Sequence, residues 1–203
     1  MDIVRRYNRP QSSTSELLSS LVELGLLYKD SSSRSYSPTP RAAMLGAVAQ
    51  PTVFRNGVLT DIVDRLVAQT GLGVAVFGMT GLNVQIFSYK SGAKTIRTAN
   101  PKGISCGLQE PLADSAPGWL LLSTIPQPRR EGVVRRLNAE AGEDKKFSTV
   151  EMGLRMEHCI NTGTAQGVAG FGTIADSCCI LLPGQQENQR IAIGFIYEPG
   201  AQV

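Results

Sequence analysis

Enzymatic chemistry in this chain would have to involve its single histidine, His158. A Ser-His-Asp or Cys-His arrangement would need it, and Cys159 stands next to it in a stretch whose pattern predicts a helix. Adjacent residues of a helix point about 100° apart, so these two side chains do not share a face. The chain also contains no G-x-S-x-G sequence. The sequence therefore favours a protein that is not an enzyme.

A metal site and a nucleotide cofactor are both poorly supported. The four cysteines contain no C-x-x-C pair and there is one histidine, whereas zinc sites need several such ligands at paired spacings. Buried, inert thiols are the simpler interpretation. The segment Gly170–Ala175 matches G-x-G-x-x-A, but a strand-like run, Ile174–Leu182, follows it where a dinucleotide site requires a helix. We expect a loop beside a pocket there, with no cofactor and no metal.

Composition places the chain among ordinary globular proteins. Of 203 residues 42% are hydrophobic and 18% are charged, and the net charge is +3. No apolar stretch approaches the ~20 residues of a membrane span, and no apolar signal segment follows the first arginines. We expect a cytoplasmic protein with no membrane partner. The charge permits nucleic-acid binding without requiring it.

The first 41 residues predict a small helical unit with a hairpin. After Pro10, four leucines repeat with helical spacing, Ser12 or Ser13 can cap this helix, and Gly25 can end it. Two short extended runs, Leu26–Lys29 and 35–37, flank a polar loop and predict a β-hairpin. A helical turn or two before Pro10 completes the order helix, helix, hairpin, which is typical of a winged helix-turn-helix.

A second domain is predicted from residue 57 to residue 203, after a connector at 42–56. Alternating helical and extended patterns, closed by an antiparallel hairpin, indicate an α+β domain with an antiparallel sheet. The expected helices are 57–71, Ser115–Ile125, Arg129–Ala141 and Ser148–Ile160, and the expected strands are Gly73–Thr80, Asn83–Ser91, Cys178–Leu182 and Arg190–Glu198.

These segments resemble the isocitrate lyase regulator (IclR) family of bacterial transcription factors. Residues Ser12–Leu27 and Tyr36–Arg41 resemble the family's recognition helix and wing, and Gly107–Leu122 is similar to its G-x-x-x-P-L-x-x-x-A-x-G-x-x-L-L segment. Ile174–Pro183 and Ile191–Gly194 resemble its closing strands. The resemblance covers nearly the whole chain. It implies a winged-helix DNA-binding domain joined to a GAF-like effector domain, in a homodimer or homotetramer that binds operator DNA.

The chain departs from the family pattern in two places. The family's winged domain begins with a further helix, before the segment that matches residues 1–41. No counterpart of that helix is found in this sequence, so we expect the winged helix to be incomplete. Glu16 stands where the family has arginine, and an acid there would repel phosphate. The alternative interpretation is therefore a ligand-binding or oligomerisation module that does not bind DNA alone.

The expected DNA contacts combine cations that flank the helix and hairpin with polar groups that could reach bases. They are Arg9, Gln11, Ser12, Ser13, Ser15, Ser19, Lys29, Arg34 and Arg41.

The expected effector site draws on three segments that the resemblance places around a cavity. Its residues are Met79, Cys106, Gly107, Leu108, Leu112, Ala116, Trp119, Gly170, Phe171, Ile174, Ala175, Asp176 and Cys178. With Trp119 and Phe171 as flat surfaces, the site suits a small organic acid or aromatic effector. Backbone N–H groups of the glycine-rich loops, or of the helix beginning near Ser115, could hold its carboxylate.

Overall fold

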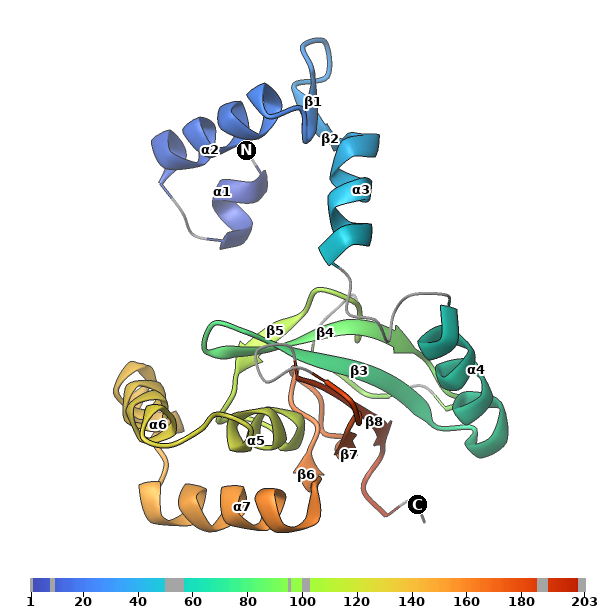
Figure 1. The fold of residues 1–203 in the computed structure, drawn as a ribbon, viewed down its shortest axis with the longest axis vertical. Coiled ribbons are helices and arrows are strands. Elements are labelled where there is room, and N and C mark those ends of the chain that lie inside the picture. The colour runs from blue at the N-terminus through green and yellow to red at the C-terminus, as the bar shows by residue number, and fades with distance from the viewer. Residues whose placement is uncertain are drawn as a thin grey trace. The chain divides into compact units, whose positions relative to one another are not determined.

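The computed structural model describes residues 2–7, 10–49, 57–94, 96–99, 103–185 and 190–200. The chain divides into two compact units, Met1–Gly57 and Val58–Val203 (Figure 1). Their mutual arrangement is not determined, so each unit is treated separately.

The Met1–Gly57 unit consists of helices and one hairpin, in the order that the sequence predicted. Helices α1 (Asp2–Tyr7) and α2 (Gln11–Glu23) precede strands β1 (Leu27–Asp30) and β2 (Ser35–Pro38), which pair antiparallel. Gly25 ends the α2 segment with a positive φ of 68°, as expected. Helix α3 (Pro40–Ala49) occupies much of the segment predicted as a connector.

Two details of this unit differ from the expectation. Neither Ser12 nor Ser13 caps α2: the N-cap is Pro10, whose carbonyl accepts the Thr14 hydroxyl at 2.8 Å. Proline at this position supplies the required backbone conformation without a side-chain cap. Of the leucines predicted to pack, Leu18 is buried, whereas Leu17 and Leu24 remain exposed, because little of the unit covers that face.

The turn of the hairpin contains a rigid polar cluster and an unusual backbone. Asp30 accepts hydrogen bonds from the Ser32 backbone N–H at 2.8 Å and from the Ser32 and Ser33 hydroxyls at 2.6 Å. These bonds hold the pKa of Asp30 well below its usual range. Arg34, near the end of the turn, has a φ of 53°, a left-handed conformation that is uncommon for a residue with a side chain.

The Val58–Val203 unit is built on a six-stranded antiparallel sheet in the order β5-β4-β3-β8-β7-β6. The strands are β3 (Gly73–Thr80), β4 (Asn83–Lys90), β5 (Gln109–Pro111), β6 (Thr164–Val168), β7 (Asp176–Leu181) and β8 (Ile191–Tyr197). Central β3 and β8 are almost wholly buried, in keeping with their continuous apolar sequences. The α+β class and the antiparallel sheet are confirmed, while short β5 and edge strand β6 were not predicted.

Four helices accompany the sheet: α4 (Val58–Thr70), α5 (Ala116–Ser123), α6 (Arg129–Glu140) and α7 (Thr149–Thr162). Helix α5 lies between the sheet and α7 (Figure 1). Because α5 is apolar on every side, its leucines 120–122 are fully buried in the main core. Helix α7 begins as predicted, with the Ser148 hydroxyl accepting the Glu151 N–H at 3.3 Å.

Among the described residues, no helix is long and apolar enough to cross a membrane. The same part of the chain contains no group of three or more His, Cys, Asp or Glu side chains able to hold a metal ion.

Candidate functional site

Three surface pockets of the Val58–Val203 unit can be compared as ligand sites. One lies beside Glu110 and Phe171, with a volume of about 340 Å³. The second lies beside Trp119, between α7 and edge strand β6, and measures about 590 Å³. The third, of about 370 Å³, lies between α6 and α7. Residues of the expected effector site line the first two of these pockets.

The Glu110 pocket is bordered by a carboxyl group that the chain itself holds firmly. The Glu110 Oε2 atom accepts the Phe171 backbone N–H at 2.5 Å. Gly170 lies directly against the same carboxyl group, where a Cβ atom would overlap Oε1. At the rim, Lys145 Nζ pairs with Asp114 Oδ2 at 2.9 Å. Glu110 Oε2 and Lys145 Nζ therefore have partners within the chain, whereas the buried Glu110 Oε1 atom has no hydrogen-bond partner among the described residues.

Burial raises the pKa of Glu110, and the Asp114 carboxylate adds to the rise, whereas the Ser115 hydroxyl and the Phe171 N–H oppose it. Ser115 itself, the N-cap of α5, is fully buried. An effector carboxylate was expected at this helix end or at the glycine-rich loops. In the structure, the Phe171 N–H of the glycine-rich loop is already taken by the Glu110 carboxyl group.

The Trp119 pocket presents a fixed aromatic ring beside a cation. The indole N–H of Trp119 donates to the Ala113 carbonyl at 2.7 Å, and a Cβ atom at Gly167 would lie 2.9 Å from the ring. The Arg155 guanidinium, from α7, lies 4.4 Å from the ring centroid. Among the described residues, Arg155 has no ion pair and no hydrogen bond. Asp176 and His158 also line this pocket.

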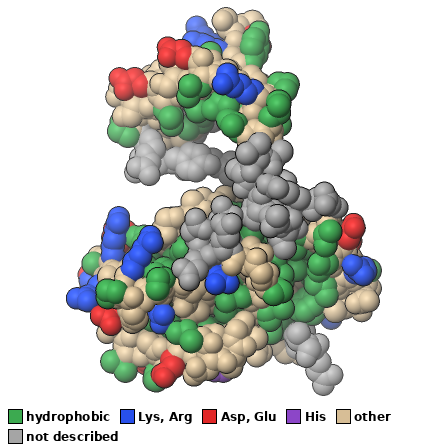
Figure 2. Space-filling view, viewed as in Figure 1, with side chains coloured by type: hydrophobic (Ala, Val, Ile, Leu, Met, Phe, Trp, Pro, Cys, Tyr) green, Lys and Arg blue, Asp and Glu red, His purple; other side chains and the backbone are tan. Residues whose placement is uncertain are grey.

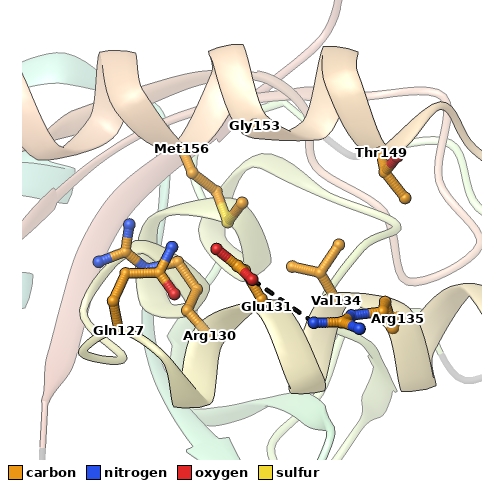
Figure 3. A pocket seen from close by; sticks show the side chains of 8 residues that line it. All are labelled: Gln127, Arg130, Glu131, Val134, Arg135, Thr149, Gly153 and Met156. Carbon is orange, nitrogen blue, oxygen red and sulfur yellow. Dashed lines mark hydrogen bonds and ion pairs between the residues drawn. The ribbon is translucent and has the colours of Figure 1, made fainter.

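The pocket between α6 and α7 has an apolar floor of Val134 and Met156 (Figure 3). Its charged groups are largely satisfied, since Arg135 pairs with Glu131 at 3.4 Å and the Arg130 Nε–H donates to the Ile125 carbonyl at 2.7 Å. Basic side chains gather over this end of the unit (Figure 2). Ion pairs of this kind along α6 are typical of a solvated helix face.

The structure divides the expected effector residues among three surroundings. Leu112, Ala116, Phe171 and Ala175 belong to the buried core. Phe171 is 7% exposed and stacks on Phe77 with ring centroids 6.1 Å apart, so it packs the core more than it lines a cavity. The residues that line pockets are Leu108 and Phe171 in the Glu110 pocket, and Trp119 and Asp176 in the Trp119 pocket.

The remaining expected effector residues line none of these three pockets. Ile174 is 58% exposed, Cys106 and Gly107 are exposed, and Met79, Gly170 and Cys178 are half-buried. Glu110 and Arg155 are among the charged residues that line the pockets and were not expected from the sequence. Glu110 stands inside the family-like segment Gly107–Leu122, which was a usable signal, whereas Arg155 shows no local signal.

The expected DNA contacts of the Met1–Gly57 unit lie mostly on its surface. Those that are exposed are Gln11, Ser12, Ser13, Ser19, Lys29, Arg34 and Arg41. Ser15 is half-buried, on the side of α2 that packs with Leu18. Arg9 lies outside the described residues. Ser12 and Ser19 share their helix face with Glu16 and Glu23, so this face of α2 carries acids beside the hydroxyls.

The cysteine and histidine positions give no catalytic arrangement among the described residues. His158 is exposed and Cys159 is buried, so the two side chains point in different directions from α7. All four cysteines are free thiols, of which Cys159 and Cys179 are buried. Burial raises the pKa of both buried thiols, which keeps them protonated and weakly nucleophilic. A strand follows Gly170–Ala175, so the dinucleotide-binding arrangement is not formed.

These features define a class of protein: a small helical unit with a hairpin, joined to a unit whose antiparallel sheet is backed by helices around a buried core. No protein-family model and no curated protein sequence matches the chain. Solved structures do match it.

Several of the similar structures are IclR-type regulators. The chain matches the IclR transcriptional regulator of Alicyclobacillus acidocaldarius with 17% identity and a TM-score of 0.69, over 100% of this chain and 80% of that one. It matches an IclR-family regulator from Brucella abortus with 18% identity and a TM-score of 0.63, over 97% and 73% of the two chains. It matches the IclR protein of Thermotoga maritima with 13% identity and a TM-score of 0.63, over 100% of this chain and 80% of that one. The chain thus has the fold of IclR-type regulators, which confirms the resemblance at the level of the fold.

Proposed function

We propose that this chain is a DNA-binding transcription regulator whose affinity for operator DNA is controlled by a small organic molecule bound in the Val58–Val203 unit. The supporting observation is that the likeness to solved IclR-type regulators extends over 97–100% of the chain and therefore includes the Met1–Gly57 unit. The proposed function needs no catalysis and no cofactor. It would be exercised in the cytoplasm, by a homodimer or homotetramer.

In this proposal, the Met1–Gly57 unit acts as a winged helix-turn-helix. Helix α2 enters the major groove and the β1–β2 hairpin lies along the phosphate backbone. Lys29 and Arg34 are exposed cations of the hairpin, and Arg41 follows at the start of α3. With Glu16 and Glu23 on α2, most of the attraction to DNA would come from these cations, and base recognition by the α2 hydroxyls would be modest.

The effector would act by shifting the population between DNA-competent and incompetent arrangements, for which a coupling of ~1–3 kcal/mol is typical. We place it in the GAF-like Val58–Val203 unit, at the pocket beside Trp119, because the Arg155 guanidinium there has no acceptor among the described residues, whereas Glu110 Oε2 and Lys145 have partners. Trp119 and Asp176 are the expected effector residues that line this pocket.

Replacing Arg34 by alanine tests the DNA-binding part. Binding of the full chain to duplex DNA is measured by fluorescence anisotropy over a series of salt concentrations. Loss of one phosphate contact should weaken binding at every sequence and reduce the slope of log K against log salt by roughly one unit. Arg129→Ala, which removes an exposed arginine of α6, is the matched control. An unchanged slope for Arg34→Ala, or an equal change in both variants, would contradict the wing assignment.

A second candidate is a ligand-binding or oligomerisation module that does not bind DNA by itself. The observation that favours it is the surface of α2, where Glu16, Leu17, Glu23 and Leu24 are exposed and no cation of α2 accompanies them. Under this alternative, the chain shows no measurable affinity for duplex DNA even at low salt, while it still binds a small molecule.

A further inference from the structure

Arg155 occupies an unusual position among the basic residues of the Val58–Val203 unit. Several basic residues of this unit pair with acids: Arg135 with Glu131, Arg136 with Glu140, Lys145 with Asp114 and Lys146 with Glu143. Arg155 instead lies over the Trp119 ring and, in the described structure, meets no acid. Its guanidinium N–H groups therefore have no protein acceptor.

The ring beneath Arg155 is held in place from two sides. The Trp119 indole N–H donates to the Ala113 carbonyl, and the edge of the ring closes against Gly167 of β6. Stacking on a fixed ring restricts the guanidinium as well, so that less conformational entropy is lost when its N–H groups bind an acceptor. The Arg155 guanidinium thus presents restrained hydrogen-bond donors in the wall of a 590 Å³ pocket.

The rest of the pocket is mostly apolar, with His158, Gln166 and one acid, Asp176, as its polar side chains. Leu154, Cys159, Ala165 and Val168 supply hydrocarbon or thiol surface from α7 and β6, and Leu154 and Val168 are 63% and 49% exposed. Asp176 contributes one negative charge, which balances the positive charge of Arg155. A doubly charged phosphate would meet one arginine and this acid, so the charges suit a singly charged anion better.

We propose that this pocket binds the carboxylate of a small organic molecule, with Arg155 taking the carboxylate in a two-pronged hydrogen bond and the molecule's apolar body lying on Leu154, Ala165 and Val168. A guanidinium and a carboxylate match in shape and charge. The inference rests on the proposed function in treating the Val58–Val203 unit as the ligand-binding unit. It assigns the recognition of the acid to α7, and not to the helix end near Ser115.

The experiment uses Trp119, the single tryptophan of the chain, as the reporter. The full chain is titrated with phenylacetate in the absence of DNA while tryptophan fluorescence is followed, and phenylacetamide serves as the uncharged ligand of the same shape. We expect a saturable change with phenylacetate, with a dissociation constant on the order of 1 mM for so small a ligand. Phenylacetamide should bind roughly tenfold more weakly or not at all.

Three variants separate recognition from folding. Arg155→Gln should weaken phenylacetate binding by roughly tenfold or more, because it removes a charge-assisted hydrogen bond. Arg155→Lys keeps the positive charge but cannot form two parallel hydrogen bonds to a carboxylate. Its affinity for phenylacetate should therefore lie between that of Arg155→Gln and that of the unchanged chain. Arg129→Gln on α6 removes an equal charge elsewhere and should leave the affinity unchanged. Urea unfolding of each variant shows whether the fold is retained.

Equal binding of phenylacetate and phenylacetamide, or full affinity in Arg155→Gln, would overturn the inference, and so would the absence of any saturable change. DNA is then added as a separate measurement. If phenylacetate binds through Arg155 and DNA affinity does not respond, the carboxylate site stands and effector control of DNA binding fails. If the chain binds DNA but phenylacetate gives no saturable change in Trp119 fluorescence, the carboxylate site fails and DNA binding stands.

Discussion

Glu110 and Arg155 are both charged residues beside aromatic side chains, yet their surroundings are opposite. The Glu110 carboxyl group accepts the Phe171 N–H at 2.5 Å and is closed off by Gly170. The Arg155 guanidinium is exposed, lies over Trp119 at 4.4 Å, and has no acceptor among the described residues. One oxygen of the Glu110 carboxyl group is bonded within the chain and the group is enclosed, whereas the exposed Arg155 guanidinium still has N–H donors to offer to a ligand.

One fold thus encloses the carboxyl group of its own Glu110 in one pocket and leaves Arg155 open to the carboxylate of a ligand in another. A helix end and a glycine-rich loop suggest an anion site from sequence alone. Whether that site is available depends on a nearby side chain, here Glu110 of β5. Unpaired charge at a pocket wall is therefore a better guide to ligand chemistry than the backbone motif.

The largest expected effect concerns the closure over Glu110. Gly170→Ala would place a Cβ atom on the carboxyl group and would strain a residue whose φ is 77°. We expect the free energy of unfolding to fall by about 2–4 kcal/mol, measured by urea denaturation with Trp119 fluorescence.

Gly172→Ala is the matched control for this loop. Its φ is 70°, but nothing lies within 4 Å of the added Cβ atom, so the loss should be limited to about 1 kcal/mol. If both variants lost the same free energy of unfolding, Glu110 would not be tightly enclosed, and its contrast with the exposed Arg155 would weaken.

A moderate effect is expected from pH. The pKa of Glu110 is raised above its unfolded value of 4.5, so the native state keeps a proton that the unfolded state releases. The contribution of Glu110 to the free energy of unfolding should therefore decline as pH rises above 4.5, until pH passes the native pKa. Glu110→Gln removes this decline. Urea unfolding of both proteins between pH 4.5 and 8 measures the difference, and parallel curves would contradict the prediction.

The smallest effect is expected at Arg155. Because the side chain is exposed and unpaired, Arg155→Gln should change the free energy of unfolding by less than about 1 kcal/mol, the value of an exposed cation–aromatic contact. The same denaturation experiment measures it. A loss of several kcal/mol would show that Arg155 stabilises the fold, and its contrast with Glu110 would disappear.

The sequence predicted the elements whose burial follows a regular period. Helix α4 and strands β3 and β8 were found because apolar residues repeat along them or fill them continuously. Strand β6 was missed, since Thr164–Val168 is short and contains Ala165 and Gly167, residue types that are depleted in strands. It is specified by pairing with β7 and by its position next to Trp119, and neither contact can be read from five residues.

The site was predictable only in part, for a similar reason. Trp119 was identified from the family-like segment that contains it. Arg155 reaches Trp119 because α7 packs on α5, and nothing in the sequence near residue 155 indicates that meeting. Phe171 was expected to line a cavity, but its stacking on Phe77 depends on how the glycine-rich loop turns toward β3.

Arg34 has a consequence for how this chain has been selected. A left-handed residue with a side chain costs on the order of 1–3 kcal/mol, and a hairpin selected only for folding would place glycine or asparagine there. An arginine at a φ of 53° therefore places a positive charge near the hairpin tip at a local cost in stability. Natural relatives that have lost the need for this charge would be expected to drift toward glycine at this position.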